Sequence, residues 1–339
     1  LRRWIESGAK YQAHWAYLPV QRPAPPSPAV PTAAQGSSSG RRQPSARVHP
    51  IDRFLDERIA AAGLVAAPEA DRRTLIRRLS LDLHGLPPDP VSVERFVKSG
   101  DPQAFERLVD DYLASPRFAE RMAVSWLDLV RYADSIGFHG DCTLSVWPYR
   151  DWVIRAFHEN MPFDRFTREQ IAGDLLPSAT EQQRIASGFN RLNRMSTEGG
   201  AQDKEYLAKY AAGRIRTFST VWLGSTMGCA ECHDHKFDPF TTRDFYRLEA
   251  FFADIKEKGF YEKGFAENDW GPKLSLPTPA QTKRLAELDA AIRSAEARLD
   301  EVHPGDFASA RVAWAEEILA ADKATNLEWR ALAPFGLET

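Results

Sequence analysis

Apolar residues recur at three- and four-residue spacing through most of this chain, and that periodicity limits its fold more than any other feature. From Pro50 onward the pattern is typical of amphipathic helices, and stretches that alternate apolar with polar residues are almost absent. The sequence therefore predicts an all-α fold: an irregular multi-helix domain with long loops, without a convincing strand or an internal repeat. The expected helices cover 51–64, 75–83, 103–114, 117–133, 149–160, 166–175, 180–189, 203–227 and 241–253.

Composition changes divide the chain into four parts. Residues 1–20 are expected to be a helix end and a short tail, and 21–47 form a linker rich in Pro, Ala, Ser and Gly. The helical domain is expected over 48–260, with loops at 134–148 and 191–202. A helical hairpin is expected over 278–325, because apolar residues from Leu285 to Val302 follow heptad spacing. The chain begins with Leu1 rather than Met, so we expect a piece of a longer protein, in which a missing signal peptide carries no weight.

Charge and hydropathy exclude several classes of function. The formal net charge is −3, with 44 Lys and Arg against 47 Asp and Glu, which gives no reason to expect a nucleic-acid partner. No run of 18 apolar residues is present, so we expect no membrane span. Three cysteines are too few for a disulfide scaffold, and two of them belong to one motif, which leaves Cys142 alone.

That motif is Cys229, Cys232 and His233, a C-x-x-C-H sequence of the kind that attaches a c-type haem. Two thiols at this spacing can bond to the two vinyl-derived positions of one porphyrin, and the adjacent imidazole can bind the iron. Covalent haem c is the preferred interpretation, and it implies an exported, periplasm-like location. The alternatives are a zinc or iron site, a structural disulfide, or chance.

A haem iron held by His233 has a sixth coordination position to account for. All four methionines precede His233 in the chain, and Met195, in a loop with two glycines, is the best of them. His139, also in a loop, is the second candidate distal ligand. We expect the loops 134–148 and 191–202 to form one wall of the pocket, since glycine lets backbone approach a cofactor closely. His235 is too near His233 to reach the opposite face, but it could bind a second metal or gate a proton.

The chain also resembles a known family along an ordered series of motifs. These are 49–54 (HPIDRF), 75–83 (LIRRLSLDL), 85–88 (GLPP), 127–135 (LDLVRYADS), 149–154 (YRDWVI), 161–164 (MPFD), 172–177 (AGDLLP), 198–200 (EGG) and 229–239 (CAECHDHKFDP). The match is to the planctomycete-type cytochrome c-like domain 2 family, a domain of unknown function (1549), over roughly 48–260. Residues 1–20 resemble the tail of a preceding cytochrome c-like haem domain.

The resemblance implies that Cys229 and Cys232 form haem thioethers and that His233 is the axial ligand. It implies as partners other haem domains of the same polypeptide, or redox partners, and it supplies no substrate. Relatives often carry a His before the Glu-Gly-Gly motif, where this chain has Leu192 and Asn193. If that His is a distal ligand, this chain lacks it.

Three functions compete at this stage. The first is an electron-transfer or redox module of an exported multidomain protein. The second is a metal-dependent enzyme with zinc or iron held by Cys229, Cys232, His233 and His235, and with Asp134 or Glu198 as base. Four ligands within seven residues would be cramped, because structural zinc sites draw on two separated pairs. The third is a scaffold with a Cys229–Cys232 disulfide.

Overall fold

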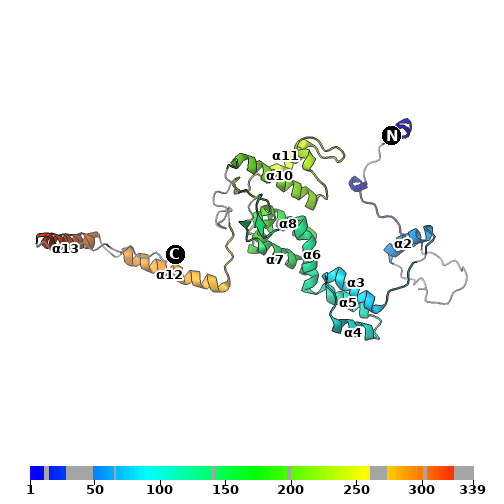
Figure 1. Cartoon of the computed structure of the whole chain (residues 1–339), viewed down its shortest axis with the longest axis horizontal. Helices are drawn as coiled ribbons and strands as arrows, with labels where there is room; N and C mark the ends of the chain where they lie inside the picture. The colour runs from blue at the N-terminus through cyan, green and yellow to red at the C-terminus, as the bar shows by residue number, and fades with distance from the viewer. Residues whose placement is uncertain are drawn as a thin grey trace. The chain divides into compact units, whose positions relative to one another are not determined.

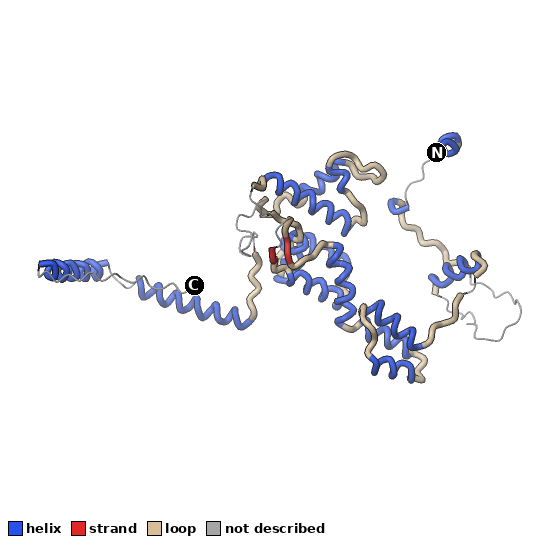
Figure 2. Tube along the Cα trace, viewed as in Figure 1, coloured by secondary structure: helices blue, strands red, loops and turns tan. Residues whose placement is uncertain are grey.

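The computed structural model describes residues 1–10, 15–27, 49–64, 66–138, 142–196, 200–259, 273–300 and 304–323. Nearly all of the regular structure in these residues is helical, as Figure 2 shows, and the all-α prediction is confirmed. Contacts divide the chain into two compact units. The first unit comprises Leu1–Asp134, Ser145–Asn193 and Arg214–Phe240, and the second comprises Ser135–Leu144, Arg194–Gly213 and Thr241–Thr339.

Most helices belong to the first unit (Figure 1). They are α1 (Arg2–Glu6), η1 (Trp15–Tyr17), α2 (Pro50–Ala61), α3 (Arg72–His84), α4 (Pro90–Lys98), α5 (Ala104–Leu113), α6 (Pro116–Leu129), α7 (Trp147–His158), α8 (Phe163–Ala172), η2 (Gly173–Leu175), α9 (Glu181–Ala186), η3 (Ser187–Arg191) and η4 (Gly228–Glu231). The predicted boundaries agree with these to within a few residues, except that α4 and the short 3₁₀ turns η1 and η4 are not predicted.

Local sequence explains where several of these helices begin and end. The side chain of Asp71 accepts a 3.0 Å hydrogen bond from the Thr74 N–H and caps α3. Asp89 does the same for α4 through Ser92, at 2.9 Å, and Pro90 occupies the first helical position. Helix α3 ends at Gly85, whose φ of 70° is left-handed and suits glycine.

The core of the first unit lies where α6 packs against α7. Its buried side chains are Ala123, Val130, Tyr149, Trp152, Val153, Ala156, Phe166, Ala186, Phe189 and Leu192. The rings of Trp152 and Phe166 stack with centroids 5.4 Å apart, and Trp126 meets Phe166 edge to face at 4.8 Å. Aromatic pairs of this kind stabilise a core beyond the apolar area that they bury.

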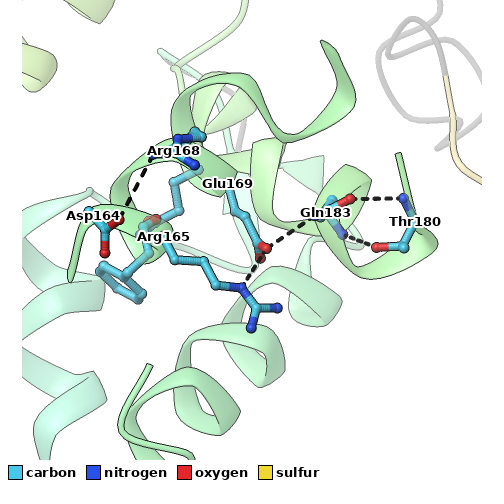
Figure 3. Close-up of polar contacts among 8 residues, drawn as sticks. Asp164, Arg165, Arg168, Glu169, Thr180 and Gln183 are labelled. Carbon is cyan, nitrogen blue, oxygen red and sulfur yellow. Dashed lines mark hydrogen bonds and ion pairs between the residues drawn. The ribbon is translucent and has the colours of Figure 1, made fainter. Parts of the chain in front are cut away.

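A polar corner joins α8 to α9, and Figure 3 shows its contacts. The carboxylate of Glu169 is buried, and its Oε1 accepts hydrogen bonds from Arg165 at 2.9 Å and from Gln183 at 3.2 Å. Gln183 also completes a capping box with Thr180 at the start of α9. The backbone at Gly173 lies close to that of Gln183. A Cβ on Gly173 would clash with the Gln183 carbonyl oxygen, so only glycine fits here without a shift.

The second unit contains β1 (Ser135–Ile136), β2 (Cys142–Thr143), α11 (Thr242–Ala250), α12 (Pro279–Asp300) and α13 (Pro304–Lys323). Strands β1 and β2, of two residues each, pair antiparallel within the segment predicted to be a loop. Two-residue strands are too short to produce a readable alternation of apolar and polar residues. Ile136 of β1 is buried with Met195 and Tyr210.

The C-terminal helices α12 and α13 form where the sequence predicts them. Their large apolar side chains, among them Leu285, Leu288, Ile292 and Trp314, are exposed. The packing of the two helices into a hairpin therefore stays a prediction. Most of the predicted linker, 28–47, lies outside the described residues.

Helix α10 (Asp203–Trp222) begins in the second unit and ends in the first. The sequence predicts that it continues to 227, and this boundary was wrong. The chain turns at Gly224, whose φ of 60° is left-handed, and the Ser225 N–H donates back to the Ser219 carbonyl at 3.2 Å. The C-x-x-C-H motif therefore follows the helix after a turn rather than lying on its last residues.

Candidate functional site

Cys229 lies on η4 (Gly228–Glu231), a short 3₁₀ turn in the first unit, and Cys232 is the C-cap residue that ends it. The Cys232 N–H donates to the Cys229 carbonyl at 3.3 Å, the bond that closes such a turn. A 3₁₀ helix has three residues per turn, so side chains at positions i and i+3 eclipse one another. Cys229 and Cys232 are three residues apart, and both are exposed and free. The two thiols therefore share one exposed side of the turn.

The opposite side of the same turn is buried. Met227 and Ala230, also three residues apart, have almost no exposed surface. The Ala230 N–H donates to the Met227 carbonyl at 2.9 Å. The small side chain of Ala230 between the two cysteines thus lets the turn lie against the protein while both thiols face outward.

Helix α10 holds the turn at two points. The buried hydroxyl of Ser219 accepts a hydrogen bond from the Met227 N–H at 3.3 Å and donates to the Arg216 carbonyl at 3.1 Å. The guanidinium of Arg216 forms an ion pair with the carboxylate of Glu231, the residue that directly precedes Cys232. The motif is therefore tied to the helix both before Cys229 and before Cys232.

The ring of His233 is oriented by the backbone next to it. Its Nδ1 lies 2.9 Å from the Asp234 carbonyl oxygen, and because a carbonyl can only accept, Nδ1 must carry the proton that it donates. In the neutral ring, Nε2 then keeps its lone pair. Metal-binding histidines typically donate their second ring N–H to a backbone carbonyl or a carboxylate in this way. His233 is exposed and therefore presents a ligand atom at the surface of the turn.

His235 has the opposite arrangement. Its Nδ1 accepts a 2.9 Å hydrogen bond from the Asp238 N–H, so the neutral ring carries its proton on Nε2. The His235 N–H donates to the Phe240 carbonyl at 2.8 Å, and the ring meets that of Phe240 edge to face. His235 thus closes the turn over 235–240, and in this tautomer neither ring nitrogen offers a lone pair to a metal. Its role as a ligand stays a prediction, which this geometry disfavours.

Of the two candidate distal ligands, the structure describes only Met195. Met195 is buried in the second unit beside Ile136 and Tyr210, while His139 lies outside the described residues. Both stay predictions, as does the expected pocket wall formed by the loops 134–148 and 191–202. The side chain of Cys142 also lies outside what the structure describes.

The candidate bases of the metal-enzyme hypothesis are Glu198 and Asp134. Glu198 lies outside the described residues. The Asp134 carboxylate accepts a 2.5 Å hydrogen bond from the Tyr132 hydroxyl. Burial, with this bond as a further cause, raises the pKa of Tyr132 above its usual value. Asp134 therefore already has a phenol partner at an exposed position.

No three His, Cys, Asp or Glu side chains in the part of the chain that the structure describes are grouped closely enough to hold a metal ion. None of its helices combines the length and the apolar character that crossing a bilayer requires.

Sequence reasoning missed Arg216 and Ser219. Both lie on the helix that precedes the motif. Their partners lie 15 positions later for Arg216 and 8 positions later for Ser219, so these contacts depend on how the chain turns at Gly224. The only signal in the sequence is the opposite charge of Arg216 and Glu231, which by itself is common on a helical surface.

Comparison with known proteins gives one finding. Residues 50–257 match the family model PSCyt2, described as a protein of unknown function (DUF1549). No curated protein and no solved structure matches the chain.

Proposed function

Since the chain belongs to the PSCyt2 family, whose description assigns no activity, we propose from its residues that it is a c-type haem-binding redox module of an exported multidomain protein. One observation carries the proposal. Two free thiols share an exposed face of one 3₁₀ turn, directly before a histidine whose Nε2 lone pair is available. The three chemical groups of a c-type attachment site are thus present together.

The residues fit the chemistry of haem attachment. Each thiol would add across one porphyrin vinyl group, its sulfur bonding to one vinyl carbon while a proton goes to the other, so that no oxidant is needed. The Nε2 atom of His233 would serve as the axial iron ligand, with the Nδ1 proton held by the Asp234 carbonyl. A bound haem supplies one-electron redox chemistry at its iron.

The surroundings of the motif suit contact with a partner. Phe237, four residues after His233, exposes 76% of its surface, and Leu223 is also exposed. The exposed ring of Phe237, so close in sequence to His233, would be accessible to another redox protein or to a further haem domain. The proposed location is the periplasm or another exported compartment, where covalent haem attachment takes place.

The zinc or iron enzyme remains the second candidate, and the disulfide scaffold the third. The metal site would need a lone pair from His235, which its bond to the Asp238 N–H disfavours. A structural disulfide would bring the two exposed sulfurs together and leave His233 without a function.

Expression with an export signal, in a host with cytochrome c maturation machinery, tests the proposal. We expect a covalent haem stain on a denaturing gel and a pyridine haemochrome spectrum. The variant Cys229→Ala/Cys232→Ala should lose both, while the control Cys142→Ala keeps them.

Wild-type protein that carries no haem under these conditions would end the proposal. Metal analysis and thiol titration of that material would then separate the two alternatives. Stoichiometric zinc or iron would support the enzyme, and a loss of two titratable thiols would support the scaffold.

A further inference from the structure

We infer that the ion pair between Arg216 and Glu231 positions Cys229 and Cys232 so that one ligand can bond to both sulfurs at once. The inference deepens the proposed function and rests on it for the identity of the ligand. The positioning itself can be tested without haem.

The contacts around η4 support a positioning role. The turn is anchored before Cys229 by the Ser219 hydroxyl, which accepts the Met227 N–H, and before Cys232 by Arg216, which holds Glu231. Between these anchors a single 3₁₀ turn, which Cys232 caps, sets the spacing of the two thiols. Such short turns have poor hydrogen-bond geometry, so their shape depends on tertiary contacts.

Because the ion pair is largely exposed, breaking it should change the position of Cys232 rather than the stability of the whole protein. The side chain of Arg216 is 52% exposed to solvent, and that of Glu231 is 28% exposed. Exposed ion pairs contribute little to overall stability. Breaking this pair should therefore leave the protein folded while allowing Glu231, and with it Cys232, to move away from the eclipsed position.

Phenylarsine oxide is a suitable probe, since its trivalent arsenic binds tightly only when two thiols close a ring around it. The full chain with Cys142→Ser, prepared without haem, would be titrated with this probe. The variants are Arg216→Gln, Glu231→Gln, the double substitution and Arg216→Lys. Arg73→Gln, which breaks the exposed pair with Glu94 on α3 and α4, is the matched control.

The two single substitutions separate positioning from electrostatics. Arg216→Gln removes a positive charge near the thiols, and Glu231→Gln removes a negative charge. A positioning role predicts that both weaken probe binding by about fivefold, the equivalent of an exposed ion pair. The double variant should be no weaker than either single variant, Arg216→Lys should recover part of the loss, and Arg73→Gln should change nothing.

Opposite shifts in the two single variants would overturn the inference in favour of a charge effect, and unchanged binding would overturn it outright. Circular dichroism melting of each variant confirms that the fold is intact, and the rate of N-ethylmaleimide labelling reports on each thiol alone. Because no haem enters these measurements, their outcome is separate from that of the proposed function. If haem does attach, Arg216→Gln should raise the share of protein with one thioether, as measured by mass spectrometry.

Discussion

The hydroxyl of Tyr149 donates a 2.6 Å hydrogen bond to Oε1 of Gln170, and both side chains are buried in the core of the first unit. The indole N–H of Trp126 lies 3.1 Å from the same oxygen. Gln170 in turn donates through Nε2 to the Phe166 carbonyl at 3.1 Å. Burial raises the pKa of Tyr149 above its usual value, so the phenol stays protonated and remains a donor.

Replacing the shared acceptor, Gln170, should lower the free energy of unfolding more than replacing one donor, Tyr149. Gln170→Leu leaves the buried Tyr149 hydroxyl without its acceptor and should lower the free energy of unfolding by about 2–3 kcal/mol. Tyr149→Phe leaves the Gln170 oxygen bonded to Trp126 and should cost about 1 kcal/mol. Urea unfolding followed by tryptophan fluorescence measures both. The double variant should cost less than the sum, and strict additivity would show that the two side chains act independently.

Glu169 should contribute more to the free energy of unfolding than the exposed charged residues around it. Glu169→Ala removes a buried carboxylate and leaves the amide of Gln183 without its acceptor, so we expect a loss of about 2–3 kcal/mol. The matched control is Arg168→Ala, because Arg168 pairs with Asp164 at 3.9 Å on an exposed part of the same helix (Figure 3). That change should stay within about 0.5 kcal/mol in the same unfolding assay. Equal losses in the two variants would contradict the structural role of Glu169.

Gly173 and Gly100 differ in the space that the structure leaves for a Cβ atom, so alanine substitutions at the two positions can be compared. A Cβ on Gly173 would lie 2.1 Å from the Gln183 carbonyl oxygen, so Gly173→Ala must displace α9 and should cost about 1–3 kcal/mol. A Cβ on Gly100 would meet nothing within 4 Å, and Gly100→Ala should be neutral or slightly stabilising. Thermal unfolding by circular dichroism distinguishes the two. A stable Gly173→Ala variant would mean that α8 and α9 do not approach as closely as described.

The sequence predicts those parts of the fold that depend on local patterns. Breakers at Gly85, Pro87 and Pro88 marked the end of α3, and the spacing of apolar residues marked α5, α6 and α7. Asp89 and Pro90 are a start signal for α4, but that helix has only nine residues and was overlooked. The sequence identifies the attachment motif itself because its three groups are adjacent in the chain.

What the sequence could not predict depends on contacts between distant residues. The burial of Glu169 and Gln170 follows from the packing of α8 against its neighbours, and polar residues of this kind usually face solvent. The end of α10 depends on Gly224, since an isolated glycine within a helical pattern is often tolerated. The tautomers of His233 and His235 follow from backbone groups whose directions only the folded chain defines.

Stability should fall in acid because of carboxylates at helix N-termini. Hydrogen bonds from Thr74 and Ser92 hold the pKa values of Asp71 and Asp89 below their usual range. A carboxyl whose pKa is lowered by folding stabilises the protein above its unfolded pKa, and this contribution is lost as the pH falls through the folded value. Urea midpoints measured from pH 6 down to pH 2 should therefore decrease, most steeply below about pH 4. In Asp71→Asn/Asp89→Asn, which keeps the capping acceptors, the decrease should be shallower, and an unchanged slope would exclude these two groups as a cause.

His233 of the motif and His235, two residues later, should respond differently to matched substitutions. His233→Asn removes the imidazole whose Nε2 is available, so the haem-loaded protein should lose the absorbance bands of a histidine-bound haem iron. His235→Asn removes an imidazole but keeps an oxygen that can accept the Asp238 N–H, so the turn over 235–240 and the visible spectrum should both persist. His235→Ala, which has no acceptor, should keep the spectrum and lower the melting temperature. A spectrum that changes in His235→Asn and not in His233→Asn would reverse the assignment and make His235 the axial ligand.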